Sequence, residues 1–399
     1  MLFVLSLVTF AVSAQALIPN GTVPRPQLTT HQRILSDGYP AESYDVTTED
    51  GYILEVNRIP RGRKDLNNGR PRPVVFMMHG LQGSANAYIE LGPENSMAYI
   101  LANYGFDVWL GNARGVERSR RHVSLDPDSI LQKRKFWDFT WEEIALNDLP
   151  AMIDFILSKT GQEKLHYVGH SQGGTVFLVL NSMKPEYNEK FKSAHLLAGV
   201  GYKRFFPNRI LTKAAQKVDE ILFVTRALGF VELLGPGLFS DGVAPDTIDA
   251  LTNEQEIQSY GLVDAILNLF KEALEELSRS KAMVGGAAVK QYAHYGQNIR
   301  DKKFRRWDYG KWGNLLKYGW VDPPQYNLRR ITVDITMHYT LGDNLLHELD
   351  VIGMSLSIPN CKIRRVARRN FSHTDFVVAN DSRELVTEYI LNDLARRNQ

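Results

Sequence analysis

A serine in a glycine-flanked turn is the residue of this sequence best suited to nucleophilic chemistry. Ser171 stands in Gly169-His-Ser-Gln-Gly173, between the apolar runs 165–168 and 175–180. This G-x-S-x-G pattern, with a strand before it and a helix after it, predicts a tight turn that exposes the serine, a nucleophile elbow. Gly169 and Gly173 would let the neighbouring backbone approach closely. The pattern alone also arises by chance, so the catalytic interpretation depends on finding partners for the serine.

A serine hydroxyl becomes an effective nucleophile only beside a base, which an acidic residue must orient. Five histidines follow Ser171, and His373 is the favoured base because it lies in a loop after the strand-like run 363–368. His347 is the reserve. A structural role is the simpler interpretation of the other three, which are His195, His294 and His338.

The favoured acid is Asp343, in the turn sequence Thr340-Leu-Gly-Asp-Asn344 after the strand-like run 333–339. The segment from Asp343 to His373 is long enough for one helix and one strand, as a parallel crossover requires. The order serine, acid, histidine is that of α/β hydrolases. Gly-Asp-Asn is also ordinary turn chemistry, and three other carboxylates compete for the role, namely Asp334, Glu348 and Asp350.

The negative oxygen that forms during acyl transfer needs two N–H donors. The residue after the nucleophile, Gln172, supplies one in an elbow of this kind. The second is expected from His79-Gly-Leu81, which follows the apolar strand-like run 74–78. We predict the N–H groups of Leu81 and Gln172 as the oxyanion hole, with Gly80 allowing the close approach.

Alternating strand-like and helical runs in the first half of the chain predict a mostly parallel α/β sheet. A hairpin is expected over 45–60, around the turn at Asp50-Gly51. Strands are expected over 74–78 and 107–110, and a helix over 142–157.

The pattern becomes helical after about residue 200. The segments 209–234 and 260–280 both have the apolar periodicity of amphipathic helices. We therefore expect an α/β core made of 17–199 and 311–399, with a helical cap or lid at 200–310 inserted between two parts of one sheet. A second packing layer is the plainer interpretation of this insertion.

The composition is that of a globular protein. The 399 residues are 44% apolar and 23% charged, with a net charge of +2, which argues against a nucleic-acid partner. Cys361 is the single cysteine, so the sequence allows no disulfide within the chain and predicts a buried, unreactive thiol. The sequence has no pattern of metal ligands, so we expect neither a metal nor a cofactor.

The first 16 residues, MLFVLSLVTFAVSAQA, predict a cleaved secretory signal peptide. The apolar run is too short to span a bilayer and ends in small residues, although no Lys or Arg precedes it. Three N-x-S/T sequons are usable in the secretory pathway, at Asn20, Asn370 and Asn380. Asn370 is the weakest of them because a glycan there would crowd His373.

The motifs together resemble the acid lipase family, which includes gastric lipase, lysosomal acid lipase and their insect relatives. The resemblance runs from about residue 39 to 390. It is carried by Thr48-Glu-Asp-Gly-Tyr-Ile-Leu54, His79-Gly-Leu81, Gly92-Pro-Glu-Asn-Ser96, Asp107-Val-Trp-Leu-Gly-Asn-Ala-Arg-Gly115, Phe136-Trp-Asp-Phe139, Asp148-Leu-Pro-Ala-Met-Ile-Asp154, Gly169-His-Ser-Gln-Gly173 and His373-Thr-Asp-Phe376.

The resemblance implies an α/β-hydrolase fold with a cap and lid. It places the nucleophile on Ser171, the acid on Asp343, the base on His373, and the oxyanion donors on Leu81 and Gln172. Two loops depart from the family pattern. The acid loop is usually Gly-Gly-x-Asp-Trp-Leu. Here Thr340 and Leu341 replace the two glycines, and Asn344 replaces the tryptophan. The base loop is usually Asn-His-Leu-Asp-Phe, and here Ser372 and Thr374 stand beside the histidine.

We therefore expect a monomeric serine hydrolase that acts on lipid esters, acylglycerols or sterol esters, at a lipid–water interface. It would be secreted or, alternatively, held in a lysosomal or other acidic compartment. A different class of function is a lipid-binding or yolk-type carrier on a lipase scaffold. Such carriers usually lose the serine or the base, and this sequence has both.

Overall fold

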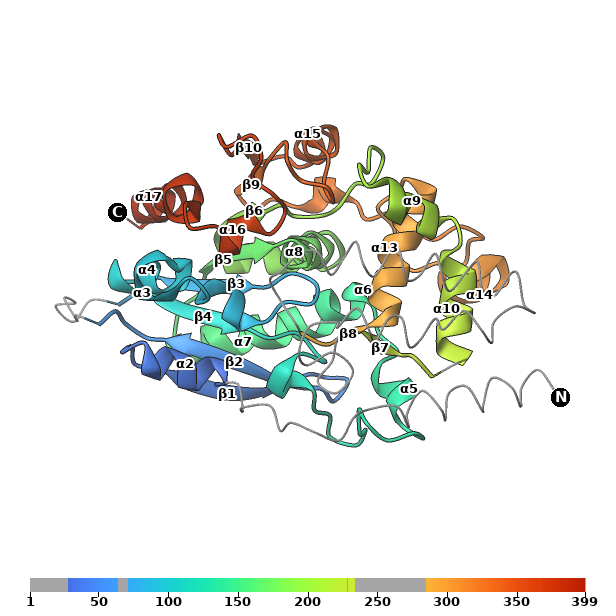
Figure 1. The fold of residues 1–399 in the computed structure, drawn as a ribbon, viewed down its shortest axis with the longest axis horizontal. Coiled ribbons are helices and arrows are strands. Elements are labelled where there is room, and N and C mark those ends of the chain that lie inside the picture. The colour runs from blue at the N-terminus through green and yellow to red at the C-terminus, as the bar shows by residue number, and fades with distance from the viewer. Residues whose placement is uncertain (1–27, 64–70, 228, 234–284, 399) are drawn as a thin grey trace, which may run out of the picture.

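The computed structural model describes residues 28–63, 71–227, 229–233 and 285–398. One sheet of eight strands runs through this part of the chain (Figure 1). Its order is β1 (Glu42–Thr47), β2 (Ile53–Ile59), β4 (Asp107–Gly111), β3 (Val74–Met78), β5 (Leu165–His170), β6 (Phe191–Leu197), β9 (Ile335–Tyr339) and β10 (Cys361–Arg365).

The sheet is parallel from β4 to β10 and antiparallel where β1 and β2 join it. The predicted hairpin is present, and Gly51 adopts the positive φ of 93° that its turn requires. The strands predicted over 74–78, 107–110 and 333–339 are present as β3, β4 and β9. The α/β-hydrolase fold predicted from the sequence is therefore confirmed, with a mostly parallel sheet whose strand ends can carry a site.

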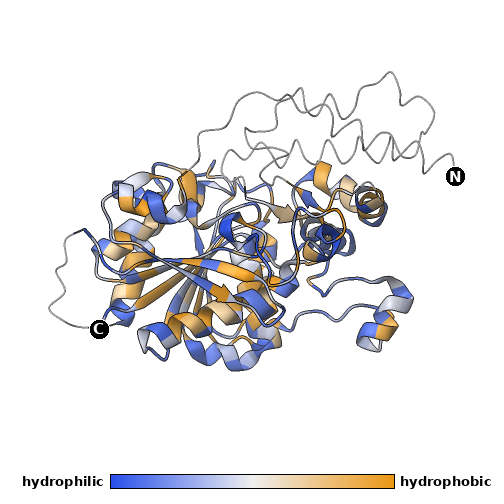
Figure 2. Cartoon of the chain, turned by 90° about the horizontal axis from the view of Figure 1, so that it is seen from below, coloured by the Kyte–Doolittle hydropathy of each residue, from blue (hydrophilic) through white to orange (hydrophobic). Residues whose placement is uncertain are grey.

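Helices cover both faces of the sheet, and the strands between them are largely apolar (Figure 2). On one side α4 (Met97–Asn103) contacts η6 (Arg383–Thr387), which continues into α17 (Glu388–Arg397). On the other side α7 (Leu149–Thr160) contacts α8 (Gln172–Met183). The predicted helix over 142–157 is longer than expected, because α6 (Trp141–Glu143) and a π-helical turn, η3 (Ile144–Asp148), lead directly into α7.

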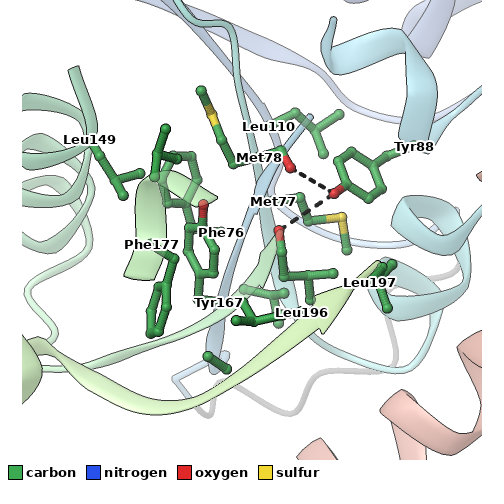
Figure 3. Close-up of a cluster of buried hydrophobic side chains, with 14 of the residues drawn as sticks. Phe76, Met77, Met78, Tyr88, Leu110, Leu149, Tyr167, Phe177, Leu196 and Leu197 are labelled. Atoms are coloured by element: carbon green, nitrogen blue, oxygen red, sulfur yellow. Dashed lines mark hydrogen bonds between the residues drawn. The ribbon is translucent and has the colours of Figure 1, made fainter. Parts of the chain in front are cut away.

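Phe76 and Tyr167, on the central strands β3 and β5, pack with Phe177 of α8 in the core (Figure 3). The Tyr88 hydroxyl donates to the carbonyl of Met78 at 2.9 Å and lies 3.5 Å from that of Val168. Met78 is the last residue of β3, and Val168 lies two residues before the end of β5. The core therefore fixes the points at which the candidate site residues leave the sheet.

Three helices gather at one end of the sheet (Figure 1). They are α9 (Arg209–Ala215), α10 (Val218–Ala227) and α13 (Val289–Asp301), and α13 contacts the other two. We call them the cap helices. A fourth helix, α14 (Gly310–Tyr318), follows them along the chain and begins at the predicted boundary between cap and core.

The prediction of one helix over 209–234 is wrong. α9 ends at Ala215, α10 ends at Ala227, and β7 (Glu232–Leu233) then pairs with β8 (Ala287–Ala288). Gly229, at φ 83°, donates its N–H to Arg226, and Phe230 donates to Thr225. This is the hydrogen-bond pattern of a helix that ends at a left-handed glycine, which the apolar periodicity could not reveal.

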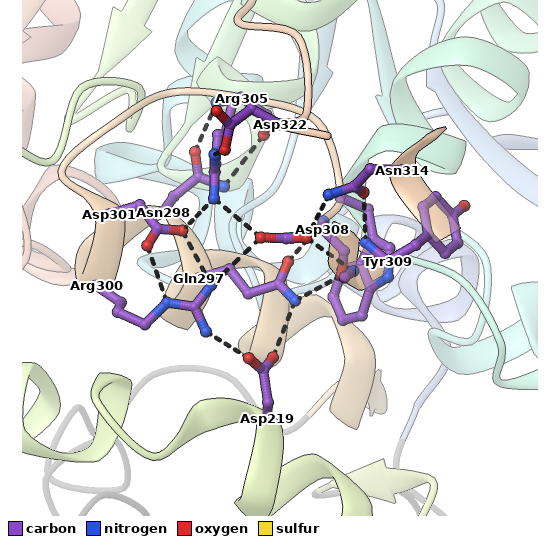
Figure 4. A network of polar contacts seen from close by, with 12 residues as sticks. Asp219, Gln297, Asn298, Arg300, Asp301, Arg305, Asp308, Tyr309, Asn314 and Asp322 are labelled. Atoms are coloured by element: carbon purple, nitrogen blue, oxygen red, sulfur yellow. Dashed lines mark hydrogen bonds and ion pairs between the residues drawn. The ribbon is translucent and has the colours of Figure 1, made fainter. Parts of the chain in front are cut away.

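A network of charged and amide side chains links α10, α13 and α14 (Figure 4). Gln297 on α13 donates to Asp219 on α10 at 3.2 Å. Asp308, just before α14, binds Arg305 at 3.0 Å and accepts from Asn314 at 2.7 Å. These contacts join α10 and α14 to α13 through polar bonds.

Several predictions fall outside the described residues, namely the signal peptide at 1–16, the sequon at Asn20 and the helix over 260–280. Among the helices that are described, none is long and apolar enough to cross a membrane.

Candidate active site

Ser171 sits at a strained turn between β5 and α8. Its φ of 50° and ψ of −111° lie outside the regions that side chains normally allow. The turn is anchored because Ser171 donates its N–H to the Leu197 carbonyl at the end of β6, at 2.8 Å. A non-glycine residue held in this way costs about 1–3 kcal/mol and marks a functional position more often than an accidental one.

The glycines around Ser171 are required by close backbone contacts. A Cβ on Gly173 would lie 2.2 Å from the Met78 carbonyl oxygen, and one on Gly169 would lie 2.6 Å from the Gly173 carbonyl carbon. Gly80 is also close, because its Cβ would come within 3.1 Å of the Ser171 Cβ. The elbow and the loop after β3 therefore approach each other as the motif predicted.

Gly173→Ala is expected to lower the free energy of unfolding by about 3 kcal/mol, because the new methyl group would overlap a backbone carbonyl that cannot rotate away. Urea unfolding followed by circular dichroism measures this loss. The matched control is Gly353→Ala, also within a helix, where the nearest atom is 3.3 Å away on the Tyr202 ring. The control should stay within about 1 kcal/mol of the wild type; equal losses in both variants would contradict the close-approach argument.

The three residues predicted as a triad are brought together. The Ser171 Oγ and the His373 Nε2 lie 2.8 Å apart, and the His373 Nδ1 lies 2.8 Å from an Asp343 carboxylate oxygen. Because the carboxylate only accepts, the His373 Nδ1 carries the proton, and in the neutral ring Nε2 accepts from the serine. The other Asp343 oxygen accepts the N–H groups of Leu345 at 2.7 Å and Leu346 at 3.0 Å.

The loops that carry Asp343 and His373 are bonded to each other and to the elbow. The Thr340 hydroxyl donates to the Phe371 carbonyl at 2.7 Å and accepts the Gly342 N–H at 3.2 Å. His170, next to the nucleophile, lies 2.9 Å from the His373 carbonyl through its Nε2, which must donate to it. Burial lowers the pKa of His170 to about 3, so this ring is neutral and positions the base without competing with it.

The other histidines have structural partners. His195 lies 3.0 Å from His338, ring nitrogen to ring nitrogen. His294 stacks on Trp141 with ring centroids 3.7 Å apart, and His347 accepts an N–H at the start of α15 (Glu348–Ser357). The competing carboxylates are also engaged, Asp350 by two backbone N–H groups, Glu348 by Tyr339 and Asp334 by Arg397.

The peptide between Gly80 and Leu81 is held in a defined orientation. The His79 Nε2 accepts the Ala113 N–H at 3.1 Å, so its Nδ1 donates to the Gly80 carbonyl at 2.7 Å. Gly83 donates to the same oxygen at 3.0 Å. In a trans peptide the Leu81 N–H points opposite to that carbonyl, so the two bonds together set its direction.

Gln172 begins α8, so its N–H has no acceptor one turn back within the helix. Its side-chain oxygen accepts from Gln291 on α13 at 3.1 Å, which joins the elbow directly to the cap helices. Gln291 also accepts the Ala288 N–H at 2.9 Å. The second predicted donor thus lies where the core and the cap helices meet.

A cavity of about 650 Å³ opens beside Ser171 and His373. The cap helices form much of its wall, with mainly apolar side chains that include Leu211, Val218, Ile221 and Ile299. Leu81 lies on the same wall. The arrangement can deprotonate a serine at the edge of an apolar chamber, as attack on an ester with a long acyl chain requires.

In the part of the chain that is described, no group of three His, Cys, Asp or Glu side chains is placed to hold a metal ion. Cys361 is half-buried at the start of the edge strand β10, and burial raises the pKa of its thiol to about 12. The predicted glycosylation sites Asn370 and Asn380 are both exposed, and glycosylation at either stays a prediction.

Sequence reasoning did not anticipate the roles of His79, His170 and Thr340, nor a buried lysine, Lys203, in the cavity wall. His79 and His170 lie within motifs that were recognised, so their positions could have suggested these roles. The bond made by Thr340 crosses between distant loops and leaves no local signal.

Comparisons with known proteins show the family to which the chain belongs. Residues 30–92 match a family model described as a partial alpha/beta-hydrolase lipase region, and residues 73–243 match the alpha/beta hydrolase fold. The chain is 34% identical to Lipase 3 of Drosophila melanogaster, over 93% of each chain. It is 35% identical to the human gastric triacylglycerol lipase, over 92% of this chain and 91% of the relative.

Among solved structures, one from Sulfolobus solfataricus has a TM-score of 0.53 at 15% identity and covers 93% of this chain and 98% of its own; this likeness concerns the fold alone. The curated relatives are lipases and match nearly the whole chain. The protein therefore belongs to the acid lipase family and is a serine-dependent carboxylic ester hydrolase.

Proposed function

We propose that this protein is a secreted lipase that hydrolyses acylglycerols or sterol esters through an acyl-enzyme on Ser171. The observation that carries the proposal is the continuous chain of 2.8 Å contacts from Ser171 through His373 to Asp343, at the wall of a largely apolar cavity. Each residue stands in the role that acyl transfer requires, in the chain order of α/β hydrolases.

In the first half of the reaction, His373 takes the Ser171 proton as the oxygen attacks the ester carbonyl. The Leu81 and Gln172 N–H groups stabilise the negative oxygen that forms. His373 then gives its proton to the leaving alcohol. Asp343 keeps the proton on Nδ1 and stabilises the charged ring.

In the second half, water attacks the acyl-enzyme with His373 again as base, which releases the fatty acid and restores Ser171. The fixed orientation of the Gly80–Leu81 peptide supports the Leu81 N–H as one oxyanion donor. An N–H that already points in its final direction needs no reorganisation when negative charge develops on the substrate oxygen. No metal or cofactor takes part in these steps.

The cavity supports the proposed substrate class. Its apolar wall suits long acyl chains, and the cap helices would shield the acyl-enzyme from bulk water. The helical insertion at 200–310 acts as the cap in this proposal, and residues 1–16 direct the chain into the secretory pathway. The similarity to a gastric triacylglycerol lipase supports glycerides as the first substrates to test.

The test is a lipid panel on full-length protein recovered from the medium of secreting cells. Fatty acid release from triolein, cholesteryl oleate and short-chain tributyrin is measured between about pH 4 and 8, the range over which a histidine base titrates. We expect hydrolysis of at least one long-chain neutral ester and labelling of Ser171 by a fluorophosphonate probe. A folded protein that binds these lipids but is neither labelled nor active would instead be a carrier.

A further inference from the structure

A lysine is buried in the wall of the substrate cavity. Lys203 lies in the loop between β6 and α9, and its residue is only 4% exposed. Its ammonium group donates to the Leu345 carbonyl at 3.2 Å and lies over the rings of Phe206, at 4.8 Å, and Tyr295, at 5.5 Å. Lys203 and these three neighbours all line the cavity that contains Ser171.

The ammonium group has no carboxylate partner among the residues that the structure describes. Within the described chain no Asp or Glu oxygen lies within 4.0 Å of it, and its one hydrogen bond leaves two of its three N–H donors without a protein acceptor. Asp343 and Asp350 act on it electrostatically, but their oxygens are engaged by His373 and by backbone N–H groups. A buried cation without a counter-ion is costly, and a ligand that carries the missing charge would offset that cost.

We propose that Lys203 forms a site for a lipid carboxylate inside the cavity. Ester hydrolysis at Ser171 generates such a group in the same chamber, so the inference rests on the proposed function and extends it to the product. An ester that carries a second, free carboxylate on its acyl chain presents the same chemistry. Phe206 and Tyr295 would face the apolar part of either ligand.

Two properties of the site support an anion over a neutral group. Neutral esters offer only weak acceptors to the free N–H donors, whereas a carboxylate makes charge-assisted bonds about twice as strong. Burial also lowers the pKa of Lys203 to about 7, which shows how poorly its surroundings stabilise the charge. A bound anion would restore the charged form.

Direct binding tests the site without relying on turnover. Calorimetric titration at pH 6 compares octane-1-sulfonate, whose charge does not titrate, with octan-1-ol, which has a similar chain and no charge. In Lys203→Gln, which can still donate to the Leu345 carbonyl, we expect the Kd for the sulfonate to rise about tenfold or more. The Kd for the alcohol should change less than twofold, and Lys203→Arg should retain the preference for the sulfonate.

Equal weakening of both ligands in Lys203→Gln would overturn the proposal and leave Lys203 as a tether for Leu345. If that variant does not fold, the same titrations of the wild type at several pH values test the proposal. The preference for the sulfonate over the alcohol must fall as the pH rises from 6 to 9, because Lys203 loses its proton. Other groups near this position that can titrate are Asp343, Asp350, His347 and His373. A preference that stays constant across this range would rule the site out.

Kinetic assays separate the two sources of the carboxylate. If the product is the ligand, octanoate inhibits p-nitrophenyl butyrate hydrolysis more strongly in the wild type than in Lys203→Gln. If an acidic ester is the ligand, the wild type favours 4-nitrophenyl hydrogen azelate over 4-nitrophenyl decanoate and the variant loses that selectivity. A protein that binds the sulfonate through Lys203 but hydrolyses no ester would contradict the proposed function and leave the binding site standing.

Discussion

Ser171→Ala is expected to lower kcat/KM for p-nitrophenyl and glyceride esters by about a million-fold. The hydroxyl is the only point of covalent attachment in the proposed reaction, so its loss removes the acyl-enzyme. The His373 Nε2 also loses its partner, the Ser171 Oγ, which lies 2.8 Å away in the wild type. The small activity that remains would come from binding and the oxyanion donors alone. Purified protein assayed at saturating and limiting ester concentrations measures the change.

The matched control is Ser182→Ala, a buried serine in α8, the helix that follows Ser171, whose hydroxyl donates to the Val179 carbonyl. It should retain activity within about threefold. Fluorophosphonate labelling should be lost in Ser171→Ala and unchanged in the control. An active, labelled Ser171→Ala protein would show that another residue is the nucleophile.

Asp343→Asn is expected to lower kcat about ten-thousand-fold with little change in fold. The amide is nearly isosteric, but it no longer compels His373 to carry its proton on Nδ1. An amide that keeps its oxygen toward the Leu345 and Leu346 N–H groups turns its NH₂ toward His373, which favours the wrong tautomer. Single-turnover kinetics with a p-nitrophenyl ester report the acylation step in which the loss should appear.

Asp350→Asn tests the rival acid. Asp350 is buried on α15 and accepts the N–H groups of Arg204 and Phe205, both at 3.0 Å. An asparagine oxygen can still accept from them, so acylation should stay within about tenfold of the wild type. The opposite ranking of Asp343→Asn and Asp350→Asn would move the acid of the triad to α15.

The sequence was sufficient for the parts of the site that depend on local patterns. The elbow was predictable because a strand, a serine between spaced glycines and an apolar helix leave a combined signal. His373 and Asp343 were predictable because each follows a strand in the required order. The structure brings all three side chains together, and the sheet that carries them matches the expected α/β-hydrolase fold.

The remaining features depend on contacts between distant segments. The break after Ala215 was hidden because α9 and α10 share one continuous apolar periodicity, and the end of α10 is set by the backbone at Gly229. The burial of Lys203 has no local signal, because Tyr295 and Leu345, which contact its ammonium group, are distant from it in the sequence. Periodicity reports which face of an element is apolar and does not report what covers a loop.

The hydroxyl of Thr340 has a consequence for the timing of catalysis. By bonding to the Phe371 carbonyl it ties the acid loop to the base loop, while His170 ties the base loop to the elbow. The bonds that hold acid, base and nucleophile together are therefore made within the core loops, and α13 joins this assembly through the bond from Gln291 to the Gln172 side chain. A movement of the cap helices would break the Gln291 bond but none of the bonds among the three groups, so it would leave the proton-transfer path intact. The rate of substrate entry and the rate of acyl transfer then become independently adjustable by mutation.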